Sequence, residues 1–258
     1  GGFEFQTQGL QFETRDGLRW PGGNVRVTQL GGVAGQGAAR GKLVADKLDL
    51  AVLAQIADRL PLGAATHTAL ANWAPKGLVE TVSATWQGPA SAPEKYEAKG
   101  RIVRLEVASK QPAGPAVRGA TVDFDLTHSG GKAAVAMDNG AFELARVFED
   151  PLIPVAQLSA DLQWQIAGQR ILVQIPKLKF SNPDVQGEAQ LKWQTSEANA
   201  SRGGGRFPGV LDLQGNLSRV QGTRVFRYLP KVILPRVRDY VREAVQKGTA
   251  SGVKFRVK

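Results

Sequence analysis

Apolar and polar residues alternate with a period of two over long stretches of this 258-residue chain. In the segment 121–127, "TVDFDLT", the residues Val122, Phe124 and Leu126 alternate with Asp123 and Asp125. Successive side chains of a β-strand point to opposite faces, so this pattern predicts a strand with one apolar and one polar face. The same pattern recurs in "FEF", "VRLEV", "LQWQI", "ILVQI", "AQLKW", "LDLQGNL" and "VKFRV".

Turn sequences separate these segments. They are "HSGG" at 128–131, "DNG" at 138–140, "AGQ" at 167–169, "SNPD" at 181–184 and "RGGG" at 202–205. Their spacing predicts hairpins between neighbouring strands, and hence a mainly β fold built on a meandering antiparallel sheet. One face of that sheet is apolar in strand after strand and must be covered. A closed two-layer sandwich and an open, twisted sheet both satisfy the alternation.

Two short helical pairs interrupt the strands. In the first, at about 46–76, Asp49 is a plausible cap for a helix that ends at Pro61, and a short helix follows at 66–77. In the second, a short segment at 223–230 precedes a helix that Pro235 opens and Gly248 stops. The side chains expected to face inward from this last helix are Val237, Tyr240, Val241, Ala244 and Val245.

The two helical pairs resemble copies of one unit. A Leu-Pro step (Leu60-Pro61, Leu229-Pro230) and then a Lys-Gly step (Lys76-Gly77, Lys247-Gly248) recur after about 170 residues, as in a modular, elongated architecture. Two unrelated helical hairpins with similar ends are the alternative.

The expected organisation has three parts within one continuous elongated unit. Residues 1–88 hold strands and the first helical pair, 89–218 a β-meander, and 219–258 the second helical pair and the start of the next strand. The ends of the sequence suggest a piece cut from a longer protein.

No catalytic, metal or cofactor site is expected. The chain has no cysteine and only two histidines, His67 and His128, which are too few for a histidine-based zinc site. Asp123 and Asp125 share a strand face at about 7 Å, but alternation with apolar residues is typical of a solvated sheet face. The glycine-rich segment 31–41 lacks a nucleotide-binding pattern and reads as a loop. No run of about 18 apolar residues is present.

The positive charge is concentrated near the C-terminal end. The net charge is +10, and residues 219–258 contain 11 Lys or Arg against two acidic residues. A solvated helix face is one interpretation, and contact with a membrane surface or lipid headgroups is a second. Nucleic acid is not an expected partner, because no reading motif accompanies the charge. The basic surface candidates are Arg224, Arg227, Lys231, Arg236, Arg238, Arg242 and Lys247.

Three segments carry a family resemblance: "RYLPKVILPRVRDYVREAVQKG", "NWAPKGLVETVSATWQG" and "LSADLQWQIAGQRILVQIPKLKFSNPDVQGEAQLKW". Through them the chain resembles the AsmA-like envelope proteins, and within these the YhdP branch. The resemblance implies a U-shaped β-groove, the periplasmic part of an inner-membrane-anchored protein, and a role in moving phospholipid toward the outer membrane. The implied partners are phospholipid and the rest of the parent chain.

The apolar strand faces suit such a role without any enzyme activity. Exposing an acyl chain of about 16 carbons to water costs on the order of 12 kcal/mol, so a lipid that crosses an aqueous gap needs apolar cover. A structural or adhesive β-scaffold that binds another envelope protein is the alternative. The groove candidates are Phe124, Leu126, Leu162, Trp164, Ile166, Ile171, Val173, Leu191, Trp193, Leu213 and Phe255.

Overall fold

The computed structural model describes residues 2–13, 15, 17, 19–20, 22–32, 39–56, 64–196, 205–207 and 209–257. The strands in the first half of the chain are β1 (Gly2–Thr7), β2 (Phe12–Glu13), β3 (Arg19–Trp20), β4 (Asn24–Leu30), β5 (Arg40–Asp49), β6 (Lys76–Gln87), β7 (Lys95–Ala108) and β8 (Ala116–Thr127). Those in the second half are β9 (Gly130–Glu143), β10 (Leu152–Ala167), β11 (Arg170–Ser181), β12 (Val185–Gln194), β13 (Val210–Gln221), β14 (Thr249–Ala250) and β15 (Val253–Val257). The helices are α1 (Leu50–Ile56), α2 (Ala64–Trp73), the 3-10 helix η2 (Gly222–Tyr228) and α3 (Pro235–Ala244).

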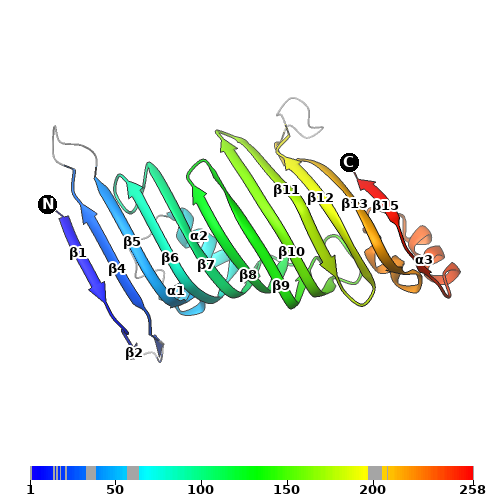
Figure 1. Ribbon diagram of the computed structural model, residues 1–258, viewed down its shortest axis with the longest axis horizontal. Helices are drawn as coiled ribbons and strands as arrows, with labels where there is room; N and C mark the ends of the chain where they lie inside the picture. The colour runs from blue at the N-terminus through cyan, green and yellow to red at the C-terminus, as the bar shows by residue number, and fades with distance from the viewer. Residues whose placement is uncertain are drawn as a thin grey trace. The chain divides into compact units, whose positions relative to one another are not determined.

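One sheet holds 13 of these strands in the order β1-β4-β5-β6-β7-β8-β9-β10-β11-β12-β13-β14, with β15 also paired to β13 (Figure 1). The sheet is antiparallel and open, because β1 and β14 end the order without pairing to each other. This confirms the predicted mainly β fold with an open antiparallel sheet. Within the described residues, the only other sheet is the two-stranded β2-β3, so no second layer of strands makes a sandwich.

The chain forms two compact units. Unit 1 comprises residues 1–112 and 121–128, and unit 2 comprises 113–120 and 129–258, so that β8 contributes to both.

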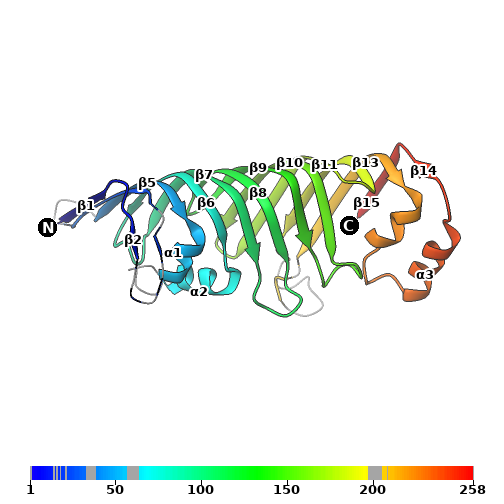
Figure 2. The same cartoon turned by 90° about the horizontal axis from the view of Figure 1, so that it is seen from below.

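Unit 1 contains a small core on the side of the sheet where α1 and α2 lie (Figure 2). Asp49 caps α1 as predicted: its Oδ1 accepts hydrogen bonds from the backbone N–H of Ala51 at 2.8 Å and of Val52 at 3.1 Å. The cap holds the apolar side of α1 against the sheet. The buried core residues are Trp20, Ala45, Leu48 and Val79, with Leu50, Val52, Leu53 and Ile56 of α1 packed against them. The predicted end of this helix at Pro61 lies outside the described residues.

In unit 2, β10 joins β11 at 168–169 and β11 joins β12 at 182–184, where the sequence predicts turns. The predicted turn at 138–140 is wrong, because these residues lie inside β9. Asn139 adopts a left-handed φ of 55° within the strand. Gly119 lies close to Gly140, because a Cβ atom added to Gly119 would be 3.3 Å from the Cα of Gly140. The "DNG" sequence therefore allows a local distortion of β9 and a close approach to β8, and it does not reverse the chain.

Pro176 lies in the interior of the sheet, in β11. The pairing register shifts there, between Ile175 and Leu178 against β12, because a proline has no N–H to donate to a neighbouring strand. The resulting bulge inserts one residue into β11, so Ile175 and Leu178 point to the same face although they differ in parity.

The last helix is shorter than predicted and differently oriented. It ends at Ala244 rather than near Gly248, and Val237 and Tyr240, predicted to face inward, are 43% and 70% exposed. Ala244 is exposed as well, while Val241 and Val245 are half-buried. None of the described helices is long and apolar enough to cross a bilayer.

Candidate functional site

The strand register places the apolar residues of unit 2 on one face of its sheet. Directly paired residues lie on the same face. One row of pairs joins Trp164 to Val173, Val173 to Trp193 and Trp193 to Leu211. We call this surface the apolar face of unit 2. It comprises Ala133, Val135, Met137, Leu158, Ala160, Leu162, Trp164, Ile166, Ile171, Val173, Ile175, Leu178, Phe180, Ala189, Leu191, Trp193, Leu211, Leu213, Leu217, Val253, Phe255 and Val257.

Most of the groove candidates meet on this face. Leu162, Trp164, Ile166, Ile171, Val173, Leu191, Trp193, Leu213 and Phe255 all belong to it. The other two, Phe124 and Leu126, lie on β8 in unit 1, where the Phe124 ring approaches Gly100 of β7. Leu178 and Phe180 were not predicted from the sequence. The bulge at Pro176 moves these even-numbered residues to the face that the odd-numbered residues of β11 occupy before it. The proline within the strand was the sequence feature that could have indicated this bulge.

The apolar face of unit 2 stays accessible to solvent. Ile166 is 39% exposed and Val257 is 48% exposed, most of the other members are half-buried, and Met137, Ala160 and Ala189 are buried. No large side chain among the described residues is fully buried. The helices of this unit pack elsewhere, on the loop 144–151 and the turn 182–184. Among the described residues of unit 2, Phe207 stacks on the Trp193 ring with the ring centroids 6.2 Å apart, but no second sheet forms a layer over the face.

Aromatic side chains lie flat on this face, over glycines of neighbouring segments. A Cβ added to Gly215 would lie 2.7 Å from the Phe255 ring, and one added to Gly209 would lie 2.7 Å from a ring carbon of Trp193. Unit 1 repeats the arrangement where Trp86 covers Gly41. Because glycine has no Cβ atom, each aromatic ring can pack flat against the backbone of the neighbouring strand or segment. The rings therefore add flat apolar area to the surface of the sheet.

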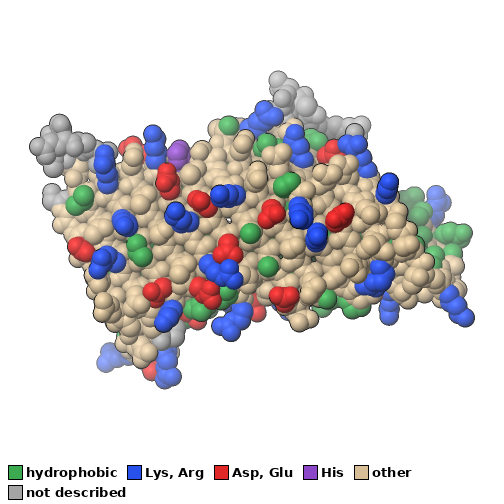
Figure 3. Space-filling model, viewed as in Figure 1, with side chains coloured by type: hydrophobic (Ala, Val, Ile, Leu, Met, Phe, Trp, Pro, Cys, Tyr) green, Lys and Arg blue, Asp and Glu red, His purple; other side chains and the backbone are tan. Residues whose placement is uncertain are grey.

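The opposite face of unit 2 is polar. Lys192 pairs with Asp212 across β12 and β13, and Arg256 of β15 forms an ion pair with Asp212 at 2.7 Å. Charges of both signs are interspersed on the surface shown in Figure 3. This division into a wet and an apolar face is the one that alternation predicts.

Asp123 of β8 lies in a cluster of ion pairs. Asp123 forms an ion pair with Arg101 at 2.7 Å, and Arg101 also pairs with Glu80 at 3.0 Å. The hydrogen bond and the charge of Asp123 raise the pKa of Arg101. These contacts form a cross-strand charge cluster.

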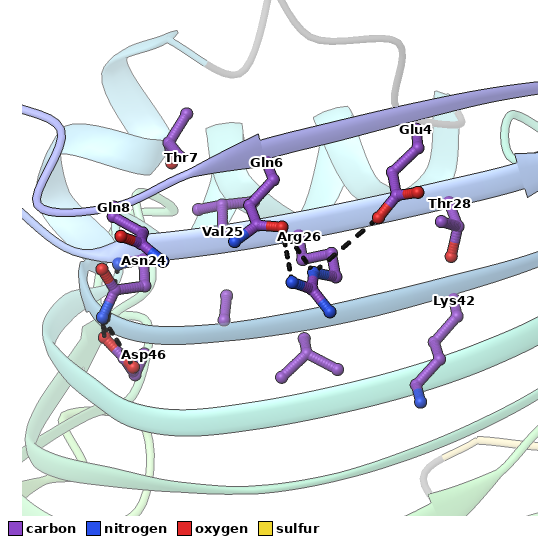
Figure 4. Close-up of a pocket in the computed structure, with 12 residues that line it drawn as sticks. Glu4, Gln6, Thr7, Gln8, Asn24, Val25, Arg26, Thr28, Lys42 and Asp46 are labelled. Carbon is purple, nitrogen blue, oxygen red and sulfur yellow. Dashed lines mark hydrogen bonds and ion pairs between the residues drawn. The ribbon is translucent and has the colours of Figure 1, made fainter.

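The depressions that the structure offers are open and have mixed polar and apolar linings. One of about 760 Å³ in unit 2 is lined by Leu178, Ala189 and Phe255 together with charged residues of β11, β12 and β15. Another of about 690 Å³ is open and lies on the polar side of β1, β4 and β5 in unit 1 (Figure 4). Arg26 there contacts Gln6 and Glu4, and the Asn24 amide donates to Asp46 at 3.0 Å. Because these polar groups form hydrogen bonds and ion pairs with one another, few of them are available to bind a ligand.

No metal site is apparent in the described residues, which contain no group of three or more histidines, aspartates or glutamates able to hold a metal ion. His128 is exposed and contacts the Tyr96 ring edge-on at 6.2 Å.

A buried polar network fixes the second helical pair to the sheet. The Asn182 Oδ1 accepts hydrogen bonds from the backbone N–H of Asp184 at 2.9 Å and of Val185 at 2.8 Å, which closes the "SNPD" turn. The Asn182 amide donates to the Tyr228 hydroxyl at 3.0 Å, and that hydroxyl donates to Asp184 at 3.0 Å. Arg227 joins Asp184 at 2.7 Å and Asp150 at 2.8 Å. The "RY" of the "RYLP" segment is thus a structural tie.

The basic candidates divide into two groups. Arg227, Lys231, Arg238 and Arg242 bind protein groups: Lys231 donates to the Ala145 carbonyl at 2.7 Å, and both Arg238 and Arg242 pair with Glu149 at 3.4 Å. Arg224, Arg236 and Lys247 are exposed and form no ion pair with any described residue. The first group attaches the helices to the loop 144–151, and only the second is available to a partner.

The Tyr228 phenol should make the stability of unit 2 sensitive to alkaline pH. Burial raises the pKa of Tyr228 from 10.0 to about 12; the hydrogen bond from Asn182 opposes this shift, and Asp184 reinforces it. The folded state therefore holds this proton where the unfolded state releases it, so the stabilisation is present below pH 10 and is lost as the pH rises to about 12. We expect urea denaturation of Tyr228→Phe to show a weaker fall in stability between these pH values than the parent chain shows. Equal pH dependence of the two proteins would refute this role of Tyr228.

A comparison with family models supplies one match. The model described as "YhdP protein" matches residues 1–258. No curated protein and no solved structure matches the chain. The match spans the whole chain, including the open sheet, the apolar face of unit 2 and the helical pair tied to it, and on this basis the chain belongs to the YhdP protein family.

Proposed function

We propose that this chain is a non-enzymatic, lipid-conducting segment of a bacterial envelope protein, whose apolar strand faces carry phospholipid acyl chains between the inner and outer membranes. The observation that carries the proposal is the apolar face of unit 2, which is continuous across β9 to β13 and β15 and has no covering layer in the described residues. Family membership supports an envelope role. Placement in the periplasm, as part of a protein anchored in the inner membrane, belongs to the same proposal.

The dimensions of the face suit an acyl chain. Neighbouring strands lie about 4.8 Å apart, so six strands extend over roughly 24 Å across the strand direction. The hydrocarbon core of a bilayer is about 30 Å thick, so the chains of one leaflet span about 15 Å. One extended acyl chain can therefore lie on the face of this unit.

The energetics also favour acyl chains as the bound part. Each methylene that leaves water contributes about 0.8 kcal/mol, and the face offers Leu, Ile, Val, Phe and Trp side chains without an ion pair among them. A headgroup can remain in water while its chains are covered. This arrangement predicts recognition of acyl chains with weak selectivity for the headgroup.

Photo-crosslinking in cells tests the proposal. A photoreactive residue placed at Leu126 or Trp164 is expected to form an adduct with phospholipid, detected by mass spectrometry of the purified protein. The same residue at Asp125 or Gln163, one position away in each strand, should give no adduct, because neighbouring side chains point to opposite faces.

Absence of lipid adducts at every tested position of the apolar strand faces would overturn the proposal. Adducts to another protein at these positions would instead favour a structural or adhesive scaffold. Equal adduct yields at Asp125 and Leu126 would indicate unspecific contact and would also count against acyl-chain binding.

A further inference from the structure

The segment 231–247 exposes a cluster of apolar side chains on a basic helical element. Val232 is 90% exposed, Tyr240 is 70% exposed and Leu234 is 56% exposed, while Val237 is partly exposed beside them in the sequence. Val237 and Tyr240 lie one turn apart in α3, so they share a side of the helix. A cluster of this kind on a surface otherwise rich in charge is typical of an interaction site.

The cations that remain free lie in and beside the same segment. Arg238 and Arg242 are engaged by Glu149, and Arg227 by Asp150 and Asp184. Arg224, Arg236 and Lys247 are exposed and form no ion pair within the described residues. Glu243 of α3 is exposed and also forms no ion pair within the described residues, so three free cations stand against one free carboxylate. The partner of this surface should therefore carry negative charge next to apolar material.

The surface is held in place before any partner arrives. The Arg238 Nη1 donates to the carbonyls of Lys231 and Ile233 at 3.1 and 2.9 Å, which fixes the turn that leads into α3. The guanidinium of Arg242 also lies over the Phe226 ring of η2 at 4.9 Å. A preorganised surface loses less conformational entropy on binding than a flexible segment does.

We propose that this surface, Val232, Leu234, Val237 and Tyr240 with Arg224, Arg236 and Lys247, docks on the anionic face of a phospholipid bilayer. A bilayer interface offers both features at once, phosphate groups for the cations and an acyl boundary for the valines, the leucine and the tyrosine. Nucleic acid would use the cations but has no place for the exposed Val232 and Leu234. The inference does not require acyl-chain conduction, because bilayer docking and groove binding involve different residues.

Vesicle flotation with the full chain tests the docking surface. We expect binding to vesicles of equal parts phosphatidylglycerol and phosphatidylcholine at about 0.05 M salt, and much weaker binding at about 0.5 M salt, where charges are screened. Vesicles of phosphatidylcholine alone should bind poorly. The double variant Arg236→Gln/Lys247→Gln should weaken binding about tenfold or more, and Val232→Ser/Tyr240→Ser by a similar factor.

Matched variants on the polar face of unit 2 serve as controls. Lys192→Gln/Lys254→Gln removes the same charge, and Val210→Ser removes an exposed valine of β13; both should bind like the parent. Equal loss in the control and docking variants would mean that net charge alone drives binding, and would overturn the proposal. Undiminished binding of Val232→Ser/Tyr240→Ser would do so too.

Two further measurements separate the remaining outcomes. If single-stranded DNA at equal phosphate concentration displaces the vesicles, and Tyr240→Ser does not alter DNA binding, the surface is a general polyanion site and bilayer docking is wrong. Leu191→Asp, which changes the apolar face and leaves segment 231–247 intact, should dock normally. In the parent chain, absence of lipid adducts at the apolar strand faces together with normal docking would refute only the proposed function. Lipid adducts without docking would refute only the docking surface.

Discussion

Replacing Asp184 with alanine is expected to lower the free energy of unfolding of unit 2 by about 2 to 3 kcal/mol. The Asp184 side chain is 10% exposed and accepts from both Arg227 and the Tyr228 hydroxyl. Its removal leaves a largely buried guanidinium with one acidic partner fewer, and a phenol without its acceptor. Urea denaturation followed by circular dichroism, with hydrogen exchange to locate the change in unit 2, measures the effect.

Asp212→Ala is the matched control. Asp212 also pairs with an arginine at 2.7 Å, but its side chain is 40% exposed, and an exposed pair contributes about 0 to 1 kcal/mol. A loss in Asp184→Ala no greater than in Asp212→Ala would show that the turn network does not fix the helical pair.

Replacing Leu191 with aspartate is expected to reduce the phospholipid bound to the chain by about 30-fold or more, with little change in thermal stability. Leu191 pairs with Ile175 on one side and Leu213 on the other, at the middle of the apolar face of unit 2. A carboxylate placed against an acyl chain loses hydration without gaining a partner, which costs at least about 2 kcal/mol. The fold tolerates the change because no described protein layer covers this face. Mass spectrometry of co-purified phospholipid, with a thermal melt, measures both effects.

Gln190→Asp is the control, because Gln190 is the adjacent residue of β12 and faces the polar side. It introduces the same charge without contact to the apolar face, so bound phospholipid should not change. Retained lipid in Leu191→Asp, or equal losses in the two variants, would contradict acyl-chain binding on this face. A large loss of thermal stability in Leu191→Asp would indicate that Leu191 packs against protein, as in a sealed core.

Local patterns were sufficient to predict much of the fold. The alternation around Trp164, Val173 and Trp193 predicted both the strands and the face they share, because the side-chain period of a strand is independent of its partners. The Asp49 cap was equally local, since its acceptor binds N–H groups only two and three residues away. Most of the residues on the apolar face of unit 2 could be predicted from the alternation of side chains along each strand.

Where the prediction failed, the competing influence was non-local. The "DNG" sequence is a good hairpin signal, yet the close approach of Gly119 to Gly140 and the pairing with β10 keep it inside β9. Val237 and Tyr240 were assigned inward on helical periodicity alone, but which side of a helix is buried depends on what it packs against. The contacts of Arg238 and Arg242 with Glu149 on a distant loop help to set that orientation.

The sequence by itself determined that the strands have one apolar and one polar face, because that property depends only on the order of residues along each strand. It could not decide whether the apolar face is sealed by a second sheet or left open, since the same alternation serves a sandwich and an open sheet. Only the tertiary structure decided this, through a strand order that adds each strand to one sheet. It also separated the arginines that tie the helical pair to loop 144–151 from those left facing solvent, because an ion pair depends on positions distant in the chain.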